Sequence, residues 1–563
     1  MPDIKLFRNA RIFTSVGGDS VLHEAMLVRG DRIEHIGLEK EAWDKVDKES
    51  DTVEEHDLHS SVVLPGFIDA HTHLMHFGSS LDKLDTLCLS IPQIQAALIA
   101  YREARPSSPI IFAKSFTFDT LGGRPHRSAL DHVVPDIPVI IDCADLHSCW
   151  LNSAALAAMG IEETTPDPRG GTFERDGHGR LTGLVLEQAV FDLVWPWTAE
   201  RITLEDRLGY LERVFDELLS TGISGTVDMA MTAEHLDALE HYHATRGLPI
   251  RIAAHWFLRP SETEADRAAQ VLQAAEHRRR LQSLSPWLRV VGVKIISDGV
   301  VDACTAFLKE PYFDGTRPGP IWPAEDLAQV ACLADKLDLQ LAIHAVGDAA
   351  IDQALDAIEG AMLANGPRPL RRHRVEHLEV VRPDQIDRLT RLGIVASIQP
   401  SHGDPIYLPN WLDVLGRDHR CTRAFAWSEY ADANSKVALG SDVPVAPHHT
   451  LPNIFTATTH RSAVDPKAET TDPILLGLER ISLNLETAIR FYTAGSAYST
   501  RNEDAYGTLQ PGKVADFCVL GVDPFRDGVE TLREAQRAVS QTWVAGKRAW
   551  TKVSAEEVDA VTP

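Results

Sequence analysis

Cysteine is scarce and without pattern in this 563-residue sequence. Its seven cysteines are scattered and form no Cys-x-x-Cys pair, so they do not outline a disulfide framework. The N-terminus lacks the charged-then-apolar order of a signal peptide, and no apolar run approaches the roughly 20 residues that span a bilayer. We therefore expect a soluble, cytoplasmic protein with reduced thiols and no membrane partner.

Positive charge is scarce as well. The chain carries 55 lysines and arginines against 81 aspartates and glutamates, a formal net charge of −26. This excess argues against an open nucleic-acid surface, so no nucleic-acid partner is expected. The sequence also lacks Gly-x-Ser-x-Gly, a P-loop, and a Gly-x-Gly-x-x-Gly after a strand. Neither a serine nucleophile nor a nucleotide cofactor is expected.

Short strand-like segments occur at both ends of the chain. They lie at residues 5–13, 25–28 and 32–36, and again at residues 514–520 and 538–544. Strand signals at both ends, with a different pattern between them, predict one small β-domain built from both termini. We assign residues 1–64 and 505–563 to this β-sandwich.

The middle of the chain alternates strand-like and helix-like segments, which predicts an α/β fold with a parallel sheet. The strand-like runs lie at residues 223–229, 250–257, 290–297, 339–346, 374–381, 394–398 and 437–439. Helix-like stretches at residues 326–336, 350–364 and 383–392 separate several of them. With the strand before His71 the runs make up the eight strands of a TIM-like (β/α)8 barrel. We assign residues 65–80 and 215–504 to this barrel.

The connection after the first barrel strand is far longer than one crossover helix needs. It contains a strand-like segment at residues 139–143, a helix-like segment at 151–159 and a Gly-rich, hairpin-like segment at 170–177. We therefore expect an inserted cap or substrate domain over residues 81–214.

Two histidines end the first barrel strand. His71 and His73 are one residue apart, so on a β-strand both side chains point to the same face and can hold one metal ion. Four more candidate ligands lie at or near the ends of later strands, where barrel enzymes place catalytic groups: Lys294, His344, His377 and Asp442. Each has a structural alternative, such as a core histidine, a lysine paired with a carboxylate or an N-capping aspartate. Their joint placement favours a metal site.

These residues resemble those of the amidohydrolase superfamily, and the resemblance covers nearly the whole chain. Within the superfamily the chain is similar to the YtcJ-like branch, the amidohydrolase 3 group. Four segments carry this closer match: residues 123–125 with 130–131, residues 145–156, residues 181–187, and residues 293–295 with 298–299. The segment 507–517 resembles the superfamily's return to its β-sandwich. Leu146 departs from the branch, which often has glycine before the following histidine.

The resemblance implies a ligand set and a cofactor. The two histidines of the first strand would hold a first divalent metal together with Asp442, and His344 and His377 would hold a second. Lys294 would be carboxylated by carbon dioxide and would bridge the two ions. Imidazole and oxygen ligands suit one or two zinc ions, with manganese and iron as alternatives.

Such a site performs hydrolysis, most often of a C–N bond. A metal-bound water loses its proton near neutral pH, and the metal polarises the carbonyl group under attack. Asp442 can take that proton and return it to the leaving amine.

Further residues are candidate contacts for a small-molecule substrate: His147, Trp150, Asn152, Glu187, Asp298 and His402. Trp150, with Phe116 and Phe118 nearby in the sequence, fits an apolar pocket. Structural alternatives stay open, because His147 could cap a helix, Trp150 could lie in the core and Glu187 could be an ordinary helical acid. Asp298 could instead orient a ligand histidine.

The favoured hypothesis is a metal-dependent amidohydrolase acting on a small N-substituted amide. N-substituted formamides and N-acyl aryl amines are the substrate classes that the resemblance suggests. A ring deaminase and an ester, lactone or carbamate hydrolase are enzymatic alternatives. A regulatory or binding protein that retains the barrel is the non-enzymatic one. The sequence leaves a homo-oligomer open.

Overall fold

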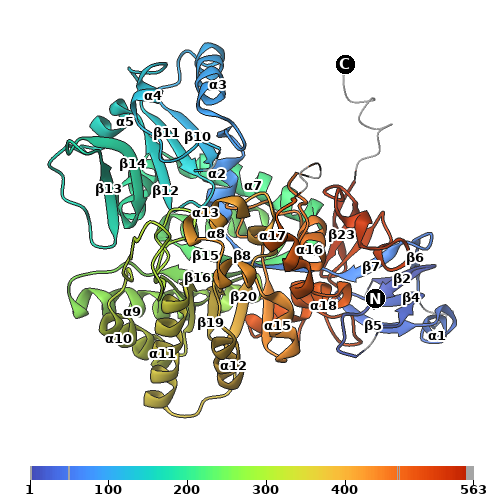
Figure 1. Ribbon diagram of the computed structural model, residues 1–563. Helices are drawn as coiled ribbons and strands as arrows, with labels where there is room; N and C mark the ends of the chain where they lie inside the picture. The colour runs from blue at the N-terminus through green and yellow to red at the C-terminus, as the bar shows by residue number, and fades with distance from the viewer. Residues whose placement is uncertain are drawn as a thin grey trace.

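A computed structural model describes residues 3–18, 20–47, 51–118, 120–465, 467 and 470–552. The extreme ends of the predicted terminal domain, residues 1–2 and 553–563, lie outside these ranges. Figure 1 shows a central barrel, a lobe above it at the upper left, and a β-rich part at the right where the blue start and red end of the chain lie together. Within the described ranges, every helix is too short or too polar to span a bilayer.

Eight parallel strands form the barrel, and their order in the sheet follows their order in the chain. They are β8 (Phe67–Thr72), β15 (Ile223–Met231), β16 (Arg251–Phe257), β17 (Leu288–Ile296), β18 (Gln340–Ala345), β19 (Arg374–His377), β20 (Val395–Ile398) and β21 (Lys436–Leu439). Nearly all of their residues are buried, because a parallel barrel sheet is covered on both faces. The barrel predicted from the alternating pattern is confirmed.

The barrel closes between β8 and the segment that follows β21. His73 donates its backbone N–H to the carbonyl of Val443 at 3.0 Å, and Asp442 donates its N–H to the carbonyl of His71 at 2.8 Å. Thr72 and Val443 form a parallel bridge between these two segments. Closure therefore brings the first and the last predicted ligands to the same end of the barrel.

Helices cover the outside of the barrel: α8 (Ala233–Arg246), α9 (Glu264–Arg280), α10 (Ala324–Lys336), α11 (Asp348–Asn365) and α12 (Pro383–Leu392). The last three correspond to the helix-like stretches expected from the sequence. Helix α12 ends at Gly393, whose φ of 65° lies in the left-handed region that suits glycine after a helix.

Two sheets pack together beside the barrel and join both ends of the chain. One has the order β5 (Arg32–Gly37), β4 (Ala25–Arg29), β1 (Ile4–Arg8), β6 (Val53–Asp57). The other has the order β24 (Lys547–Thr551), β23 (Val539–Val544), β22 (Phe517–Leu520), β7 (Val62–Pro65), β2 (Arg11–Phe13), β3 (Leu22–His23). Strand β22 (Phe517–Leu520) pairs antiparallel with β7 (Val62–Pro65), which ties the C-terminal part to the N-terminal part. The Phe7 ring of β1 (Ile4–Arg8) contacts the rings of Phe517 and Trp543, each at 4.9 Å, and so joins the two sheets.

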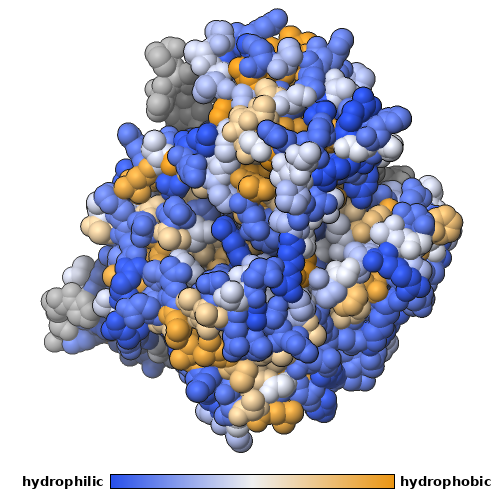
Figure 2. Space-filling model, turned by 90° about the vertical axis from the view of Figure 1, so that its left-hand side faces the viewer, coloured by the Kyte–Doolittle hydropathy of each residue, from blue (hydrophilic) through white to orange (hydrophobic). Residues whose placement is uncertain are grey.

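The lobe above the barrel is a six-stranded mixed sheet of order β13-β14-β12-β11-β10-β9. Its strands run from β9 (Leu84–Asp85) through β10 (Ile111–Phe116), β11 (Val139–Cys143), β12 (Ser148–Leu151) and β13 (Gly171–Arg175) to β14 (Leu181–Glu187). In the side view of Figure 2, hydrophilic residues cover most of the surface, and the hydrophobic ones form small separate groups.

Three element boundaries differ from the sequence-based expectation. The segment 5–13 is two strands, β1 and β2 (Arg11–Phe13), separated at Asn9, whose φ is 50°. The run 374–381 stops at His377, because His377 and Leu378 both have positive φ, which turns the chain away from the sheet. The helix expected at 151–159 begins only at Ser153, since Leu151 belongs to β12 and Asn152 is the N-cap.

Candidate metal centre

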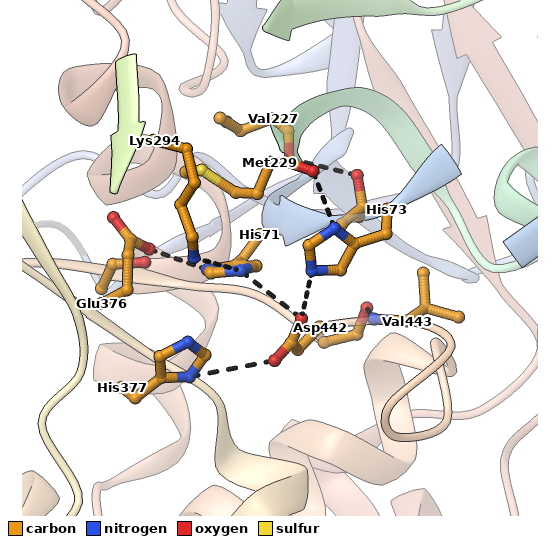
Figure 3. A network of polar contacts seen from close by, with 12 residues as sticks. His71, His73, Val227, Met229, Lys294, Glu376, His377, Asp442 and Val443 are labelled. Atoms are coloured by element: carbon orange, nitrogen blue, oxygen red, sulfur yellow. Dashed lines mark hydrogen bonds and ion pairs between the residues drawn. The ribbon is translucent and has the colours of Figure 1, made fainter. Parts of the chain in front are cut away.

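Five of the predicted ligands converge at the C-terminal end of the barrel, as Figure 3 shows. His71 lies at the end of β8 and His73 just after it, Lys294 is on β17, His377 is the last residue of β19, and Asp442 follows β21. The carboxyl ends of parallel strands share one rim, so side chains from distant parts of the sequence meet there.

Asp442 is at the centre of this group. Its Oδ1 lies 3.0 Å from His73 Nε2 and 3.4 Å from His71 Nε2, and its Oδ2 lies 3.8 Å from His377 Nδ1. The ammonium nitrogen of Lys294 is 3.5 Å from His71 Nε2. One ligand atom from each of His71, His377 and Asp442 lies within 4.8 Å of the others. A single cation can therefore reach several of these atoms at once.

The donor atoms fit a divalent metal. Nδ1 of His377 is buried and has no hydrogen-bond partner among the described residues, although it points toward Asp442. A buried polar atom without a partner is costly, and a cation would supply the missing interaction. Burial lowers the pKa of His71, His344 and His377 well below the ordinary histidine value. These rings are therefore neutral, which is the form that binds a metal ion.

His344 extends the group on one side. Its ring centroid is 4.5 Å from that of His377, and its Nε2 lies 3.1 Å from the carbonyl oxygen of Gly299. Asp298 is close, with Oδ1 3.6 Å from His344 Nε2, but this is too long for a hydrogen bond. The Asp298 carboxylate instead accepts backbone N–H groups from Phe307, Val346 and Gly347 at 2.9–3.0 Å. Asp298 thus holds the loops around His344 in place.

The two histidines of the first strand are oriented by groups on their far side. Nδ1 of His71 lies 2.8 Å from Oε2 of Glu376, and Nδ1 of His73 lies 2.7 Å from the carbonyl oxygen of Met229. A carbonyl oxygen can only accept, so Nδ1 of His73 carries the proton. Both rings therefore direct Nε2 to the centre, as partners behind metal-binding histidines do.

Two further histidine–glutamate pairs lie near this group: His147 pairs with Glu187, and His402 pairs with Glu379. Nδ1 of His147 lies 2.6 Å from Glu187, and Nδ1 of His402 lies 2.8 Å from Glu379. Burial alone would lower the pKa of each imidazole, but the neighbouring carboxylate outweighs burial, and the pKa of both histidines is raised. Glu187 does not line the cavity that contains His147 and His402. It accepts from His147 and from the Thr305 hydroxyl, and so holds His147.

Trp150 and Asn152, two of the candidate substrate contacts, are held within the inserted lobe. Trp150 is fully buried in the core of the inserted sheet, where its ring contacts Phe116. The Asn152 side chain accepts from the N–H groups of Val139 and Ala155 and donates to two backbone carbonyls. All of its hydrogen-bonding capacity is used by the scaffold, so the structure gives Asn152 a capping position in place of a substrate contact.

A cavity opens beside the candidate metal ligands, and we call it the substrate cavity. Its polar lining comprises His147, His344, His377, His402 and Asp442, together with Thr117, Asp145, Asp302 and Glu379. The rest of its lining is largely apolar, with three aromatic side chains: Phe118, Val300, Val346, Tyr407, Trp411, Val445 and Ala446. None of the described residues that line it is lysine or arginine. This composition suits a substrate with a polar bond to be cleaved and an apolar substituent.

Sequence reasoning missed Glu376 and Glu379. Glu376 is fully buried inside the barrel and accepts from both His71 and Arg374, and Glu379 holds His402. A signal was present for Glu376, because Arg374 and Glu376 are two residues apart and so point to the same side of an otherwise apolar strand. Glu379 follows the strand end and has no such periodicity.

Comparison with known proteins identifies the family to which the chain belongs. The chain matches the amidohydrolase family over residues 54–549. The Bacillus subtilis protein YtcJ is 29% identical over 517 residues, which is 89% of this chain and 93% of YtcJ. An N-substituted formamide deformylase from Arthrobacter pascens is 26% identical over 540 residues, 93% of this chain and 94% of that protein.

A solved structure agrees. An uncharacterised metal-dependent hydrolase from Pyrococcus furiosus superposes with a TM-score of 0.68 at 26% identity, over 93% of this chain and all of the other. This chain belongs to the amidohydrolase family, and its fold and donor set are those of a metal-dependent hydrolase. The family resemblance inferred from the sequence motifs is thereby confirmed.

Proposed function

We propose that this protein hydrolyses the C–N bond of a small N-substituted amide, such as an N-substituted formamide or an N-acyl aryl amine. The observation that carries this proposal is the substrate cavity, whose wall combines histidines and carboxylates with apolar and aromatic side chains and contains no described lysine or arginine. Such a wall accommodates a neutral, apolar substituent on the amide nitrogen better than an acidic one. The likeness to an N-substituted formamide deformylase supports the same substrate class.

A divalent metal, zinc in the first instance, would be held by His71, His73, His377 and Asp442, with His344 and Lys294 beside them. When bound, the metal lowers the pKa of water and polarises the amide carbonyl. Burial would raise the pKa of Asp442, but the surrounding histidines outweigh this effect and hold the pKa well below its usual range. Asp442 is therefore ionised at neutral pH, and it can accept a proton and return it to the leaving nitrogen.

His147 and His402 can each carry a proton and donate a hydrogen bond to the substrate. Each ring directs one nitrogen to a glutamate, and each side chain also lines the substrate cavity. Nε2 of His402 lies 3.5 Å from Asp442 and makes no hydrogen bond with a described residue. A protonated imidazole at either position can donate to the substrate carbonyl or to the departing amine.

We also propose that Lys294 is carboxylated. Its side chain is buried, and burial lowers the pKa of its ammonium group to about 8. A larger fraction of the amine is then neutral, and only the neutral amine can add to carbon dioxide. The added carboxylate would give the site a second anionic oxygen ligand close to His71. The buried cysteines Cys143, Cys149, Cys421 and Cys518 are free thiols, which supports our expectation of a cytoplasmic protein.

The proposal is tested by mass spectrometry of the products formed by zinc-loaded protein. A mixed panel of formamides, acyl anilides, carbamates, lactones and aminated rings is used, with metal-stripped protein as the control. Metal-dependent release of an acid and an amine is the expected result. Ammonia from the rings alone would identify a deaminase, and an alcohol with an acid would identify an ester or lactone hydrolase; either outcome would contradict amide hydrolysis.

A further inference from the structure

A second cavity, which we call the side pocket, lies beside the metal centre. It is bounded by α6 (Trp195–Ala199), by the ends of β15 and β16, and by α9. Trp195 lines this pocket and also lines the space around His73 and Lys294. The His76 ring stands next to Trp195 at 4.3 Å and lies 6.2 Å from the His73 ring. The Trp195 side chain therefore borders both the side pocket and the space around His73 and Lys294.

Two arginines give the side pocket its charge. Arg207 and Arg259 line it, and both are half-buried. Arg207 donates to the carbonyl oxygen of Ala199 at 2.8 Å, and the Arg259 guanidinium lies near the Phe257 ring. Neither guanidinium forms a direct ion pair with a carboxylate in the described part of the chain, although Arg207 interacts electrostatically with Asp206 and Glu234, and Arg259 with Asp192. In a protein of net charge −26, where most arginines have such a partner, two unpaired guanidiniums in one cavity indicate an anion site.

Two glutamates, Glu200 and Glu234, also line the side pocket, and both are exposed. Glu200 lies 3.6 Å from Arg201, which is not a lining residue of the pocket. Glu234 is exposed in the first turn of α8. Burial lowers the pKa of His235 to about 4, so this imidazole is neutral and the positive charge comes from the arginines alone. Because Arg207 and Arg259 are half-buried and both glutamates are exposed, water screens the guanidiniums less than it screens the carboxylates.

The wall between the side pocket and the space around His73 and Lys294 includes an irregular segment. Residues Val190–Val194 form a π-helical turn directly before Trp195. The Trp195 ring contacts Phe191 at 4.7 Å, and on the barrel side Ala230 has a positive φ of 68°. Single π-turns of this kind occur often at functional sites. Trp195 is thus placed by local backbone features and not by a regular helix face.

We propose that the side pocket is an exit chamber for the carboxylate product of hydrolysis, which passes Trp195 and pairs with Arg207 and Arg259. This inference rests on the proposed function, because only hydrolysis of an acyl bond makes a carboxylate at the metal centre. It also gives the reaction a direction. The amine leaves through the substrate cavity, which lacks lysine and arginine, and the acid leaves through the side pocket, which contains two arginines.

The binding of a small carboxylate tests the side pocket directly. Trifluoroacetate is titrated into zinc-loaded protein and followed by fluorine NMR. The double variant Arg207→Gln with Arg259→Gln is expected to weaken binding at least tenfold, about 1.4 kcal/mol. The control removes two exposed charges of helix α9, Arg279→Gln with Arg280→Gln, and should leave the dissociation constant unchanged within twofold. Equal affinity of the two double variants would overturn the proposal.

Metal removal separates the side pocket from the metal itself, which also attracts carboxylates. In chelator-stripped protein the arginine-dependent binding should persist with a similar dissociation constant. Binding that disappears with the metal would place the anion at the metal centre and refute the exit chamber. Circular dichroism of each variant shows whether it is folded.

Kinetics then connect the pocket to turnover. With an amide that the enzyme cleaves, the acid product should inhibit the double variant at least tenfold more weakly than wild type, while inhibition by the amine product is unchanged. Equal acid inhibition in both proteins contradicts an exit chamber. If no amide in the panel is cleaved, the proposed function fails, but the trifluoroacetate titration still decides whether the side pocket binds anions.

Discussion

Glu376 offers the sharpest test of how the metal centre is supported. The side chain is fully buried and accepts Arg374 Nε at 2.5 Å and Arg374 Nη2 at 2.9 Å, while its Oε2 lies 2.8 Å from His71 Nδ1. Burial raises the pKa of Glu376, but Arg374 outweighs it, and the pKa is held below its usual value. Glu376 is therefore a buried anion that neutralises one buried cation and orients one metal ligand.

The variant Glu376→Gln keeps the shape and removes the charge. Loss of one member of a buried ion pair typically costs about 3–5 kcal/mol, because the partner stays buried without compensation. Loss of the carboxylate behind a ligand histidine typically weakens metal binding by about 10–100-fold. We expect both effects together, since Arg374 and His71 share this one carboxylate.

Two assays separate these effects. Zinc affinity is measured by competition with a chromophoric chelator, and the urea midpoint of unfolding is measured on metal-free protein. The control is Glu359→Gln, whose partly exposed pair with Arg388 should contribute less than about 1 kcal/mol. A Glu376→Gln protein with wild-type zinc affinity would refute the idea that Glu376 orients His71.

Three further predictions follow from the same structure. Asp442→Asn should leave the fold intact, as judged by circular dichroism, and lower kcat by about 10²–10⁴-fold; near-normal rates would exclude Asp442 as the proton shuttle. Lys294→Ala should lower the zinc content measured by atomic absorption and lose activity, with partial rescue by short carboxylic acids; full zinc stoichiometry would contradict a bridging carbamate. Asp335 is buried and paired with Arg371 and His373, which outweigh the effect of burial and lower the pKa of Asp335 below the ordinary value of 3.8. The ionised carboxylate therefore stabilises the folded protein above about pH 4, and this stabilisation is lost as the pH falls further. Asp335→Asn should flatten the acid limb of a plot of unfolding midpoint against pH, and an unchanged limb would contradict this account.

Periodicity in the sequence accounts for much of the fold. The buried barrel strands are short apolar runs bounded by turn residues. Both faces of such a strand are covered, so the run is apolar along its length and can be recognised in a single sequence. The boundaries were less predictable. The strand ends at His377 because His377 and Leu378 both have positive φ. Neither histidine nor leucine is a residue type that predicts this conformation.

The substrate contacts show where sequence reasoning stopped. Nothing near Trp150 in the sequence shows which face of β12 meets the cavity, and the structure turns its ring into the core of the inserted sheet. Asn152 precedes a helix and caps it, as asparagine commonly does. The partners of His147 and His402 come from residues 23–40 positions away, which local patterns cannot pair.

The sequence by itself determined the fold class, the family and the identity of the candidate metal ligands. These depend on residue types at strand ends and on short motifs, which are local properties. Tertiary structure alone decided the rest: the meeting of His71 with Asp442, the charge shared by Glu376 between Arg374 and His71, and the place of Trp195 between two cavities. Each of these results from closing the barrel and seating the inserted lobe on it. The physical reason is that electrostatics and packing act through distance in space, and distances between segments hundreds of residues apart exist only in the folded chain.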